Sequence, residues 1–235
     1  MSKLFYAAGA LSGRDFTDPT VTYTQDAMSP KRRTDGPLHV CSVAGEVLVR
    51  SGVEWPLRLF VVEGTPYERC ADNYHYHCEN VNVLCEVPSC GVFGPCGEAV
   101  VALIERVGQL SAKEIQRFAA DDNIVNTRTL CEQMASMTIM AYESRLSAAH
   151  RSARRLASDA ARFAGQLTDI PSLHAQLAAA DCAGALVLNT HLSQTQFESC
   201  TKKWLEHTNR AGSDRYRRTL TYLQGVPADR RRNTP

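Results

Sequence analysis

The stretch Ala135–Leu167 reads ASMTIMAYESRLSAAHRSARRLASDAARFAGQL, and it decides the class of fold that we expect. Reading it in alternating steps of four and three residues gives an unbroken series of apolar or aromatic side chains. We call this series the 4-3 stripe, and its members are Ala135, Ile139, Tyr142, Leu146, Ala149, Ala153, Leu156, Ala160, Phe163 and Leu167. A mean spacing of 3.5 residues is typical of a helix that packs lengthwise against another helix. The stretch therefore predicts one long amphipathic helix in a helical C-terminal half.

Basic side chains lie between the positions of the 4-3 stripe, and they predict a solvated flank on this helix. Besides Arg145, they are Arg151, Arg154, Arg155 and Arg162. Such a flank can contact the phosphates of a nucleic acid, or it can simply keep the protein soluble. We treat these four arginines as candidate interaction residues. No helix-turn-helix, zinc-finger or single-strand-binding pattern accompanies them.

Further helices are predicted on both sides of this stretch. A helix over 98–107 is the least distinct, because its Val and Ile content also suits a strand. Capping boxes at Ser111–Glu114 and Ser193–Gln196 indicate two helix starts. A helix over 172–189 is expected behind Pro171. A last helix is expected from Ser213 to the stop at Gly225 and Pro227.

The N-terminal part reads as short strands rather than helices. Runs rich in β-branched and aromatic residues predict strands at 4–6, 21–24, 38–41, 57–63 and 81–87. The segment 88–97 contains two prolines and three glycines, so we expect the domain boundary there.

The fold class predicted from these patterns is α+β. We expect a small β-rich domain over 1–97 and a helical hairpin or bundle over 98–227. Residues 228–235 form a polar, basic tail that we expect to be disordered.

Composition and charge restrict the setting of the protein. The chain has 235 residues and a net charge of +1. Residues 1–100 carry 8 Lys and Arg against 12 Asp and Glu, whereas residues 101–235 carry 18 against 13. The basic C-terminal half permits an anionic partner such as a nucleic acid. No apolar run approaches 20 residues and the N-terminus makes a poor signal peptide, so we expect a cytoplasmic protein without a membrane span.

The clearest local feature is a concentration of cysteine and histidine, the side chains that bind zinc in tetrahedral sites. The candidates are Cys70, His75, His77, Cys78, Cys85, Cys90 and Cys96, with His39 and Cys41 upstream. Their spacing lacks the pairs of ligands two to four residues apart that mark a zinc knuckle. We therefore favour free thiols, which suit a reducing compartment, and keep a zinc site as the alternative.

The signals for catalysis are weaker. A Cys–His nucleophile could pair Cys41 with His39, or Cys78 with His75, but the sequence identifies no third group to orient the imidazole. Asp121 and Asp122 are expected to form a solvated turn. We do not expect an enzyme.

Three stretches carry a resemblance to a known family. They are DGPLHVC at 35–41, WPLRLFVVEG at 55–64 and AAHRSARRLASDAAR at 148–162, and the last continues through 186–204. Together they resemble an uncharacterised family of actinobacterial and actinophage proteins with a Gly-x-His-x-Cys type of N-terminal element. The resemblance implies a β-rich N-terminal domain with an Ala- and Arg-rich helical half. It implies no known activity, and so it assigns no catalytic residue.

The function expected from the sequence is that of a non-enzymatic interaction protein encoded by a phage or mobile element, with a protein partner. The alternative is a zinc-stabilised protein that binds nucleic acid. We expect a monomer whose other helices cover the 4-3 stripe, because the connections into the last helices are short. A dimer through the same stripe is the alternative.

Overall fold

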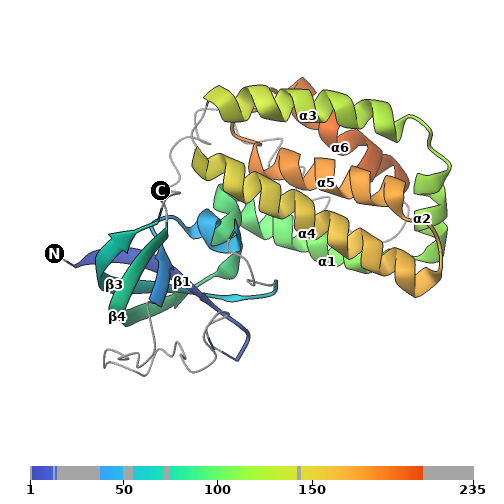
Figure 1. Cartoon of the computed structure of the whole chain (residues 1–235). Helices are drawn as coiled ribbons and strands as arrows, with labels where there is room; N and C mark the ends of the chain where they lie inside the picture. The colour runs from blue at the N-terminus through green and yellow to red at the C-terminus, as the bar shows by residue number, and fades with distance from the viewer. Residues whose placement is uncertain are drawn as a thin grey trace. The chain divides into compact units, whose positions relative to one another are not determined.

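The computed structural model describes residues 2–12, 14, 38–49, 55–70, 75–141 and 144–208. The chain divides into two compact units, Met1–Val92 and Phe93–Pro235. The first unit contains a four-stranded antiparallel sheet and the second contains helices (Figure 1). The α+β class predicted from the sequence is confirmed.

The strands of the N-terminal unit form one closed sheet. They are β1 (Lys3–Gly9), β2 (Leu38–Cys41), β3 (Arg58–Arg69) and β4 (His75–Val87), and neighbouring strands pair in the order β1-β2-β4-β3. A 3-10 helix, η1 (Ala44–Val49), follows β2. The strand predicted at 38–41 is confirmed, whereas β3 and β4 extend the strands predicted at 57–63 and 81–87.

The core of the closed sheet is made of large apolar side chains and one thiol. Phe5, Phe60, Val62 and Cys78 are almost wholly buried in it. Because successive side chains of a strand point to opposite faces, residues next to these core positions are placed on the outer face of the sheet. His77, which precedes Cys78 on β4, is only half-buried.

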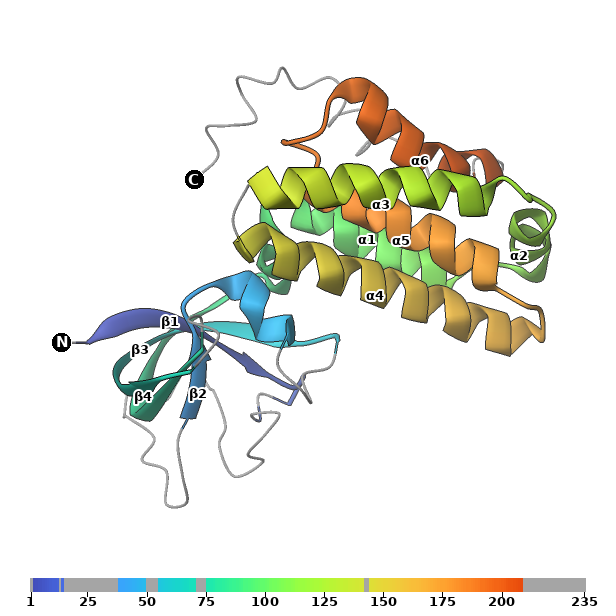
Figure 2. The ribbon, with the colours of Figure 1, turned by 45° about the horizontal axis from the view of Figure 1, so that its top comes forward.

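The helical unit begins with a 3-10 helix, η2 (Ser89–Cys96), which spans the division between the units. Its helices are α1 (Gly97–Gly108), α2 (Ala112–Ala119), α3 (Ile124–Ala141), α4 (Ser144–Thr168), α5 (Leu173–Val187) and α6 (Gln194–Thr208). Helix α5 contacts α1, α2, α3, α4 and α6, and most of its residues are buried (Figure 2). It is the central helix of the unit.

Both capping boxes predicted from the sequence are confirmed. Ser111 Oγ accepts a hydrogen bond from the backbone N–H of Glu114, whose carboxylate accepts one from the N–H of Ser111. Ser193 Oγ accepts from the N–H of Gln196, whose side-chain carbonyl accepts from the N–H of Ser193. These bonds satisfy N–H groups that have no partner in the first turn of a helix.

The prediction of a single long helix over the 4-3 stripe is wrong. The stripe is divided between α3 and α4, and it does not follow the buried face of α4. Leu156 is half-buried, and Phe163 and Leu167 are 58% and 69% exposed. The buried line of α4 runs instead through Ala149, Ala153, Ala157, Ala161 and Ala164.

The geometry of helix packing explains this error. A 3.5-residue stripe drifts by about 20° per heptad around a straight helix. The buried alanines are mostly four residues apart, which is the ridge that packs most often between helices of globular proteins. They lie against α5, which is itself rich in small buried residues. On α4, the stripe residues Ala149 and Ala153 are buried because they coincide with this ridge.

Some predicted elements lie outside the described residues. They are the strand at 21–24, the helix from Ser213 to Gly225, and the tail 228–235.

Candidate functional site

The structure distributes the seven zinc candidates over both units. Cys78 lies in the core of the closed sheet, where burial raises the pKa of its thiol to about 11. Cys96 is buried in the helical unit, and its sulfur accepts a hydrogen bond from Asn189 Nδ2 at 3.8 Å. His75 is buried, and Cys85 and Cys90 are half-buried at other positions of β4 and η2. Cys70 Sγ lies 3.6 Å from His77 Nε2.

The sheet register brings two further groups to this pair. His77 on β4 is opposite His39 on β2 and opposite Glu68 on β3. Cys70 follows β3, and its backbone N–H donates to the carbonyl of His75 at 2.9 Å, which holds it beside β4. We call His39, Glu68, Cys70 and His77 the His77 cluster.

His77 is the centre of this cluster. Its Nδ1 lies 2.6 Å from Glu68 Oε2, and its Nε2 lies 3.1 Å from His39 Nδ1 and 3.6 Å from Cys70 Sγ. An ionised carboxylate can only accept a hydrogen bond, so the contact with Glu68 places a proton on Nδ1. In the neutral ring the lone pair is then on Nε2, facing both the thiol and the second imidazole.

The grouping of the His77 cluster could not be predicted from the sequence. Glu68 carries no motif, and His39, although noted upstream of the zinc candidates, is 38 positions away from His77. The pairing of β2 with β4 creates the contact, and no local pattern of residues encodes that pairing. Of the Cys–His pairs considered earlier, Cys78 with His75 is disfavoured because the raised pKa of Cys78 keeps its thiol protonated at neutral pH.

A second group of ligand-type side chains lies in the helical unit. Among the residues that the structure describes, one set of three has ligand atoms that all lie within 4.8 Å of one another. Its members are Asp121, Glu206 and His207. Lys203 Nζ lies 2.8 Å from Asp121 Oδ2 and 3.5 Å from Glu206 Oε2. An ammonium group therefore already supplies the cation that these carboxylates need. Asp121 is not the solvated turn residue that we expected, because its side chain is only 13% exposed.

This arrangement predicts a specific dependence of stability on pH. Burial would raise the pKa of Asp121, but hydrogen bonds from Lys203, His207 and the N–H of Asn123 outweigh it and lower the pKa from 3.8 to about 2. A folded-state pKa below the unfolded one adds stability above pH 3.8, and that stability is lost as the pH falls toward 2. We expect Asp121→Asn to lower the free energy of unfolding by about 2 kcal/mol at pH 6.

Urea denaturation between pH 2 and pH 6 measures this effect, with the exposed Asp122→Asn as the control. The difference between Asp121→Asn and the wild type should shrink as the pH falls below 4. A difference that stays constant over this range would contradict the lowered pKa.

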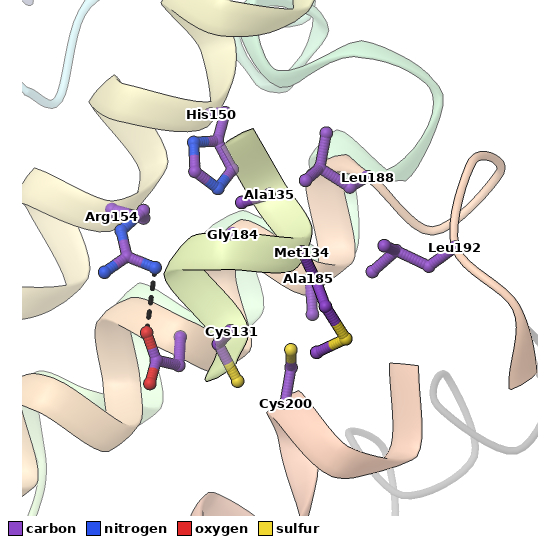
Figure 3. A pocket seen from close by; sticks show the side chains of 11 residues that line it. Cys131, Met134, Ala135, His150, Arg154, Gly184, Ala185, Leu188, Leu192 and Cys200 are labelled. Carbon is purple, nitrogen blue, oxygen red and sulfur yellow. Dashed lines mark hydrogen bonds and ion pairs between the residues drawn. The ribbon is translucent and has the colours of Figure 1, made fainter. Parts of the chain in front are cut away.

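A small cavity of the helical unit is lined by α3, α4, α5, α6 and the turn before α6 (Figure 3). It leaves about 10 Å³ for the centre of a water molecule, which is room for roughly one water. The sulfur atoms of Cys131, Met134 and Cys200 point toward one another beside it. The pKa of the Cys131 thiol is raised by its contact with Cys200 and by burial, so this thiol stays protonated. An organic substrate does not fit this space.

Polar groups at the edge of the cavity are held in fixed charge states. Burial, followed by the charges of Arg154 and Arg151, lowers the pKa of His150 to about 4, so its ring is neutral at pH 7. Arg154 Nη1 donates to Asp181 Oδ1 at 2.8 Å, and the side chain of Asp181 is 4% exposed. These contacts connect α4 with α5 and stabilise the packing.

The four candidate interaction arginines have different surroundings. Arg151 and Arg155 are exposed. Arg162 is exposed but forms an ion pair with Asp159 at 3.0 Å. Arg154 is directed toward Asp181, and its second contact is Glu132 at 3.5 Å. The exposed basic flank of α4 is thus narrower than the sequence indicated.

Comparison with known proteins adds no relative. No protein-family model, no curated protein and no solved structure matches this chain. Among the described helices, none combines the length and the apolar content that a bilayer-spanning segment needs.

Proposed function

We propose that this chain is a non-enzymatic interaction protein that binds a protein partner through the exposed apolar face of α3. That face carries Leu130, Met137 and Met140, and we call it the methionine face. Met137 is 73% exposed and Met140 is 89% exposed. Residues seven and ten positions apart share one side of a helix, and Met137 and Met140, three positions apart, are neighbours on it.

The composition of α3 supports a binding role. Three of the five methionines of the chain lie between positions 134 and 140. Met is unbranched and has a polarizable sulfur, so a surface rich in Met adapts to the shape of a partner. Helix α3 packs on α5 and α6 with its other side. On the exposed side the methionine face lies beside polar residues such as Gln133 and Ser136, so it forms an apolar patch with a polar edge.

The energy available from this face is sufficient for a binding anchor. Burying one Met side chain contributes about 1.5–3 kcal/mol. Each 1.4 kcal/mol changes a dissociation constant tenfold, so loss of both methionines should weaken binding by a factor of at least about 100.

Affinity capture from cells that carry the gene, quantified by mass spectrometry, tests the proposal. We expect a protein recovered with the wild type to be lost with Met137→Lys/Met140→Lys. The control Gln109→Lys/Gln166→Lys adds the same charge at two exposed positions, one just after α1 and one on α4, and should still recover it. Equal recovery by both double variants would contradict the proposal.

The oligomeric state is measured with the same variants. Light scattering over a hundredfold dilution should give a constant mass for the wild type, in line with the proposed monomer. A concentration-dependent mass that disappears in Met137→Lys/Met140→Lys would identify the partner as a second copy of the chain.

The proposal also includes a cellular location and a genetic origin. All nine cysteines lie in the described residues and no disulfide joins them, which fits a reducing compartment and supports a cytoplasmic location. An origin in a phage or mobile element stays a prediction that depends on the resemblance alone.

A further inference from the structure

We propose that His39, Cys70 and His77 bind one zinc ion on the closed sheet, with Glu68 orienting the His77 imidazole. This inference goes beyond the proposed protein-binding function and does not depend on the methionine face. The ligand atoms are Nδ1 of His39, Sγ of Cys70 and Nε2 of His77. Two nitrogens and one sulfur are the donor set that zinc prefers.

The distances around His77 Nε2 are close to those of a tetrahedral zinc site. With Zn–N near 2.05 Å and Zn–S near 2.3 Å, two nitrogen ligands lie about 3.4 Å apart, and nitrogen and sulfur about 3.6 Å apart. The observed separations from His77 Nε2 are 3.1 Å to His39 Nδ1 and 3.6 Å to Cys70 Sγ. Both pairs can therefore contact one ion with small adjustments.

The third pair requires a larger movement. Among the described residues, the three ligand atoms that all lie within 4.8 Å of one another are those of Asp121, Glu206 and His207. The other two separations in the His77 cluster are below this limit. The third, between Cys70 Sγ and His39 Nδ1, is therefore longer than 4.8 Å. Zinc binding would therefore require the Cys70 thiol to move toward His39, and Cys70 lies just beyond Arg69, the last paired residue of β3.

Glu68 supplies the support that zinc-binding imidazoles usually have. A histidine ligand commonly donates its other ring N–H to a carboxylate, and this contact fixes the tautomer and makes the ring more basic. The 2.6 Å contact between His77 Nδ1 and Glu68 Oε2 has this geometry. The Asp121 set differs, because Lys203 already places a positive charge among its ligand atoms.

The charges of the His77 cluster also suit a divalent cation. On binding, Cys70 loses its thiol proton to solvent and coordinates as a thiolate, while both imidazoles coordinate in their neutral forms. The thiolate and the Glu68 carboxylate together balance the two positive charges of zinc. Three protein ligands leave the fourth tetrahedral position to water or to a further ligand.

Metal titration of the full chain, purified without an affinity tag and kept reduced, tests this inference. We expect one zinc per chain in competition with a chromophoric chelator. Cobalt(II) should give the near-ultraviolet charge-transfer band of a cobalt–thiolate bond. Cys70→Ser should abolish that band, and Glu68→Gln should weaken zinc affinity by a factor of about 10–100.

Matched controls separate this site from the other thiols. Cys85→Ser and Cys90→Ser alter half-buried cysteines outside the cluster and should leave the affinity unchanged. His207→Ala tests the Asp121 set in the same way. Glu68 is 59% exposed, so Glu68→Gln should fold normally. The inference would be overturned by an absence of zinc binding, by a cobalt(II) complex that lacks the thiolate band, or by zinc binding that survives Cys70→Ser.

Discussion

Arg154→Ala is expected to destabilise the helical unit by about 3–5 kcal/mol, although the sequence alone places Arg154 on a solvated flank. Its guanidinium lies 2.8 Å from Asp181, whose side chain is only 4% exposed on the central helix α5. Removing the arginine leaves a carboxylate buried without this charge partner, and such a loss costs far more than breaking a surface ion pair. Urea denaturation followed by helical circular dichroism measures the change.

Two comparisons make this prediction specific. Arg151→Ala, an exposed change three residues earlier on α4, should cost less than about 0.5 kcal/mol. Arg154→Met/Asp181→Leu removes both charges together and should recover most of the loss, because an apolar pair needs no compensating charge. Equal effects of Arg154→Ala and Arg151→Ala would show that the pair does not hold α4 on α5.

The sequence predicts those parts of the fold that depend on neighbouring residues. The capping boxes at Ser111 and Ser193 are complete within four positions, and both are found in the structure. The strand at 38–41 likewise follows from its local composition. In each case the signal and the element occupy the same short segment.

The face on which α4 packs could not be predicted in the same way. The spacing of apolar residues defines a stripe, but a partner helix selects which ridge is buried. Helix α5 presents alanines and Gly184, and it accepts the Ala153–Ala157–Ala161 ridge rather than Phe163 and Leu167. The alanines, Phe163 and Leu167 are all apolar, so hydrophobicity alone does not decide which of them is buried, and this choice is made by steric fit.

The candidate sites show the same limit. Cys70 and His77 are recognisable as ligand types, but His39 and Glu68 join them only through strand pairing. Likewise, the inward direction of Arg154 depends on Asp181, which lies 27 positions away on another helix. A single sequence contains the residue types of both sites but not the contacts that bring them together.

Gly165→Ala should destabilise the helical unit by about 3 kcal/mol, because the end of α4 has no room for a methyl group. A Cβ at Gly165 would lie 2.5 Å from Ser172 Cβ and 2.9 Å from the backbone carbonyl oxygen of Ile170. The chain turns there with Asp169 at a φ of 53°, and the N–H of Ile170 donates to the carbonyl of Gly165 at 3.1 Å. This bond is typical of a Schellman cap, which fixes the backbone that the methyl group would have to displace.

Gly108→Ala is the matched control for this substitution. A Cβ at Gly108, the last residue of α1, would meet no atom within 4 Å. Alanine also has the higher helix propensity, so this variant should be neutral or more stable by up to about 1 kcal/mol. Thermal unfolding of both variants measures this difference in stability. Unchanged stability of Gly165→Ala would mean that the turn from α4 into α5 can open without a loss of stability. Destabilisation of Gly165→Ala alone would instead show that close contact at this turn positions α4, and with it Arg154, against α5.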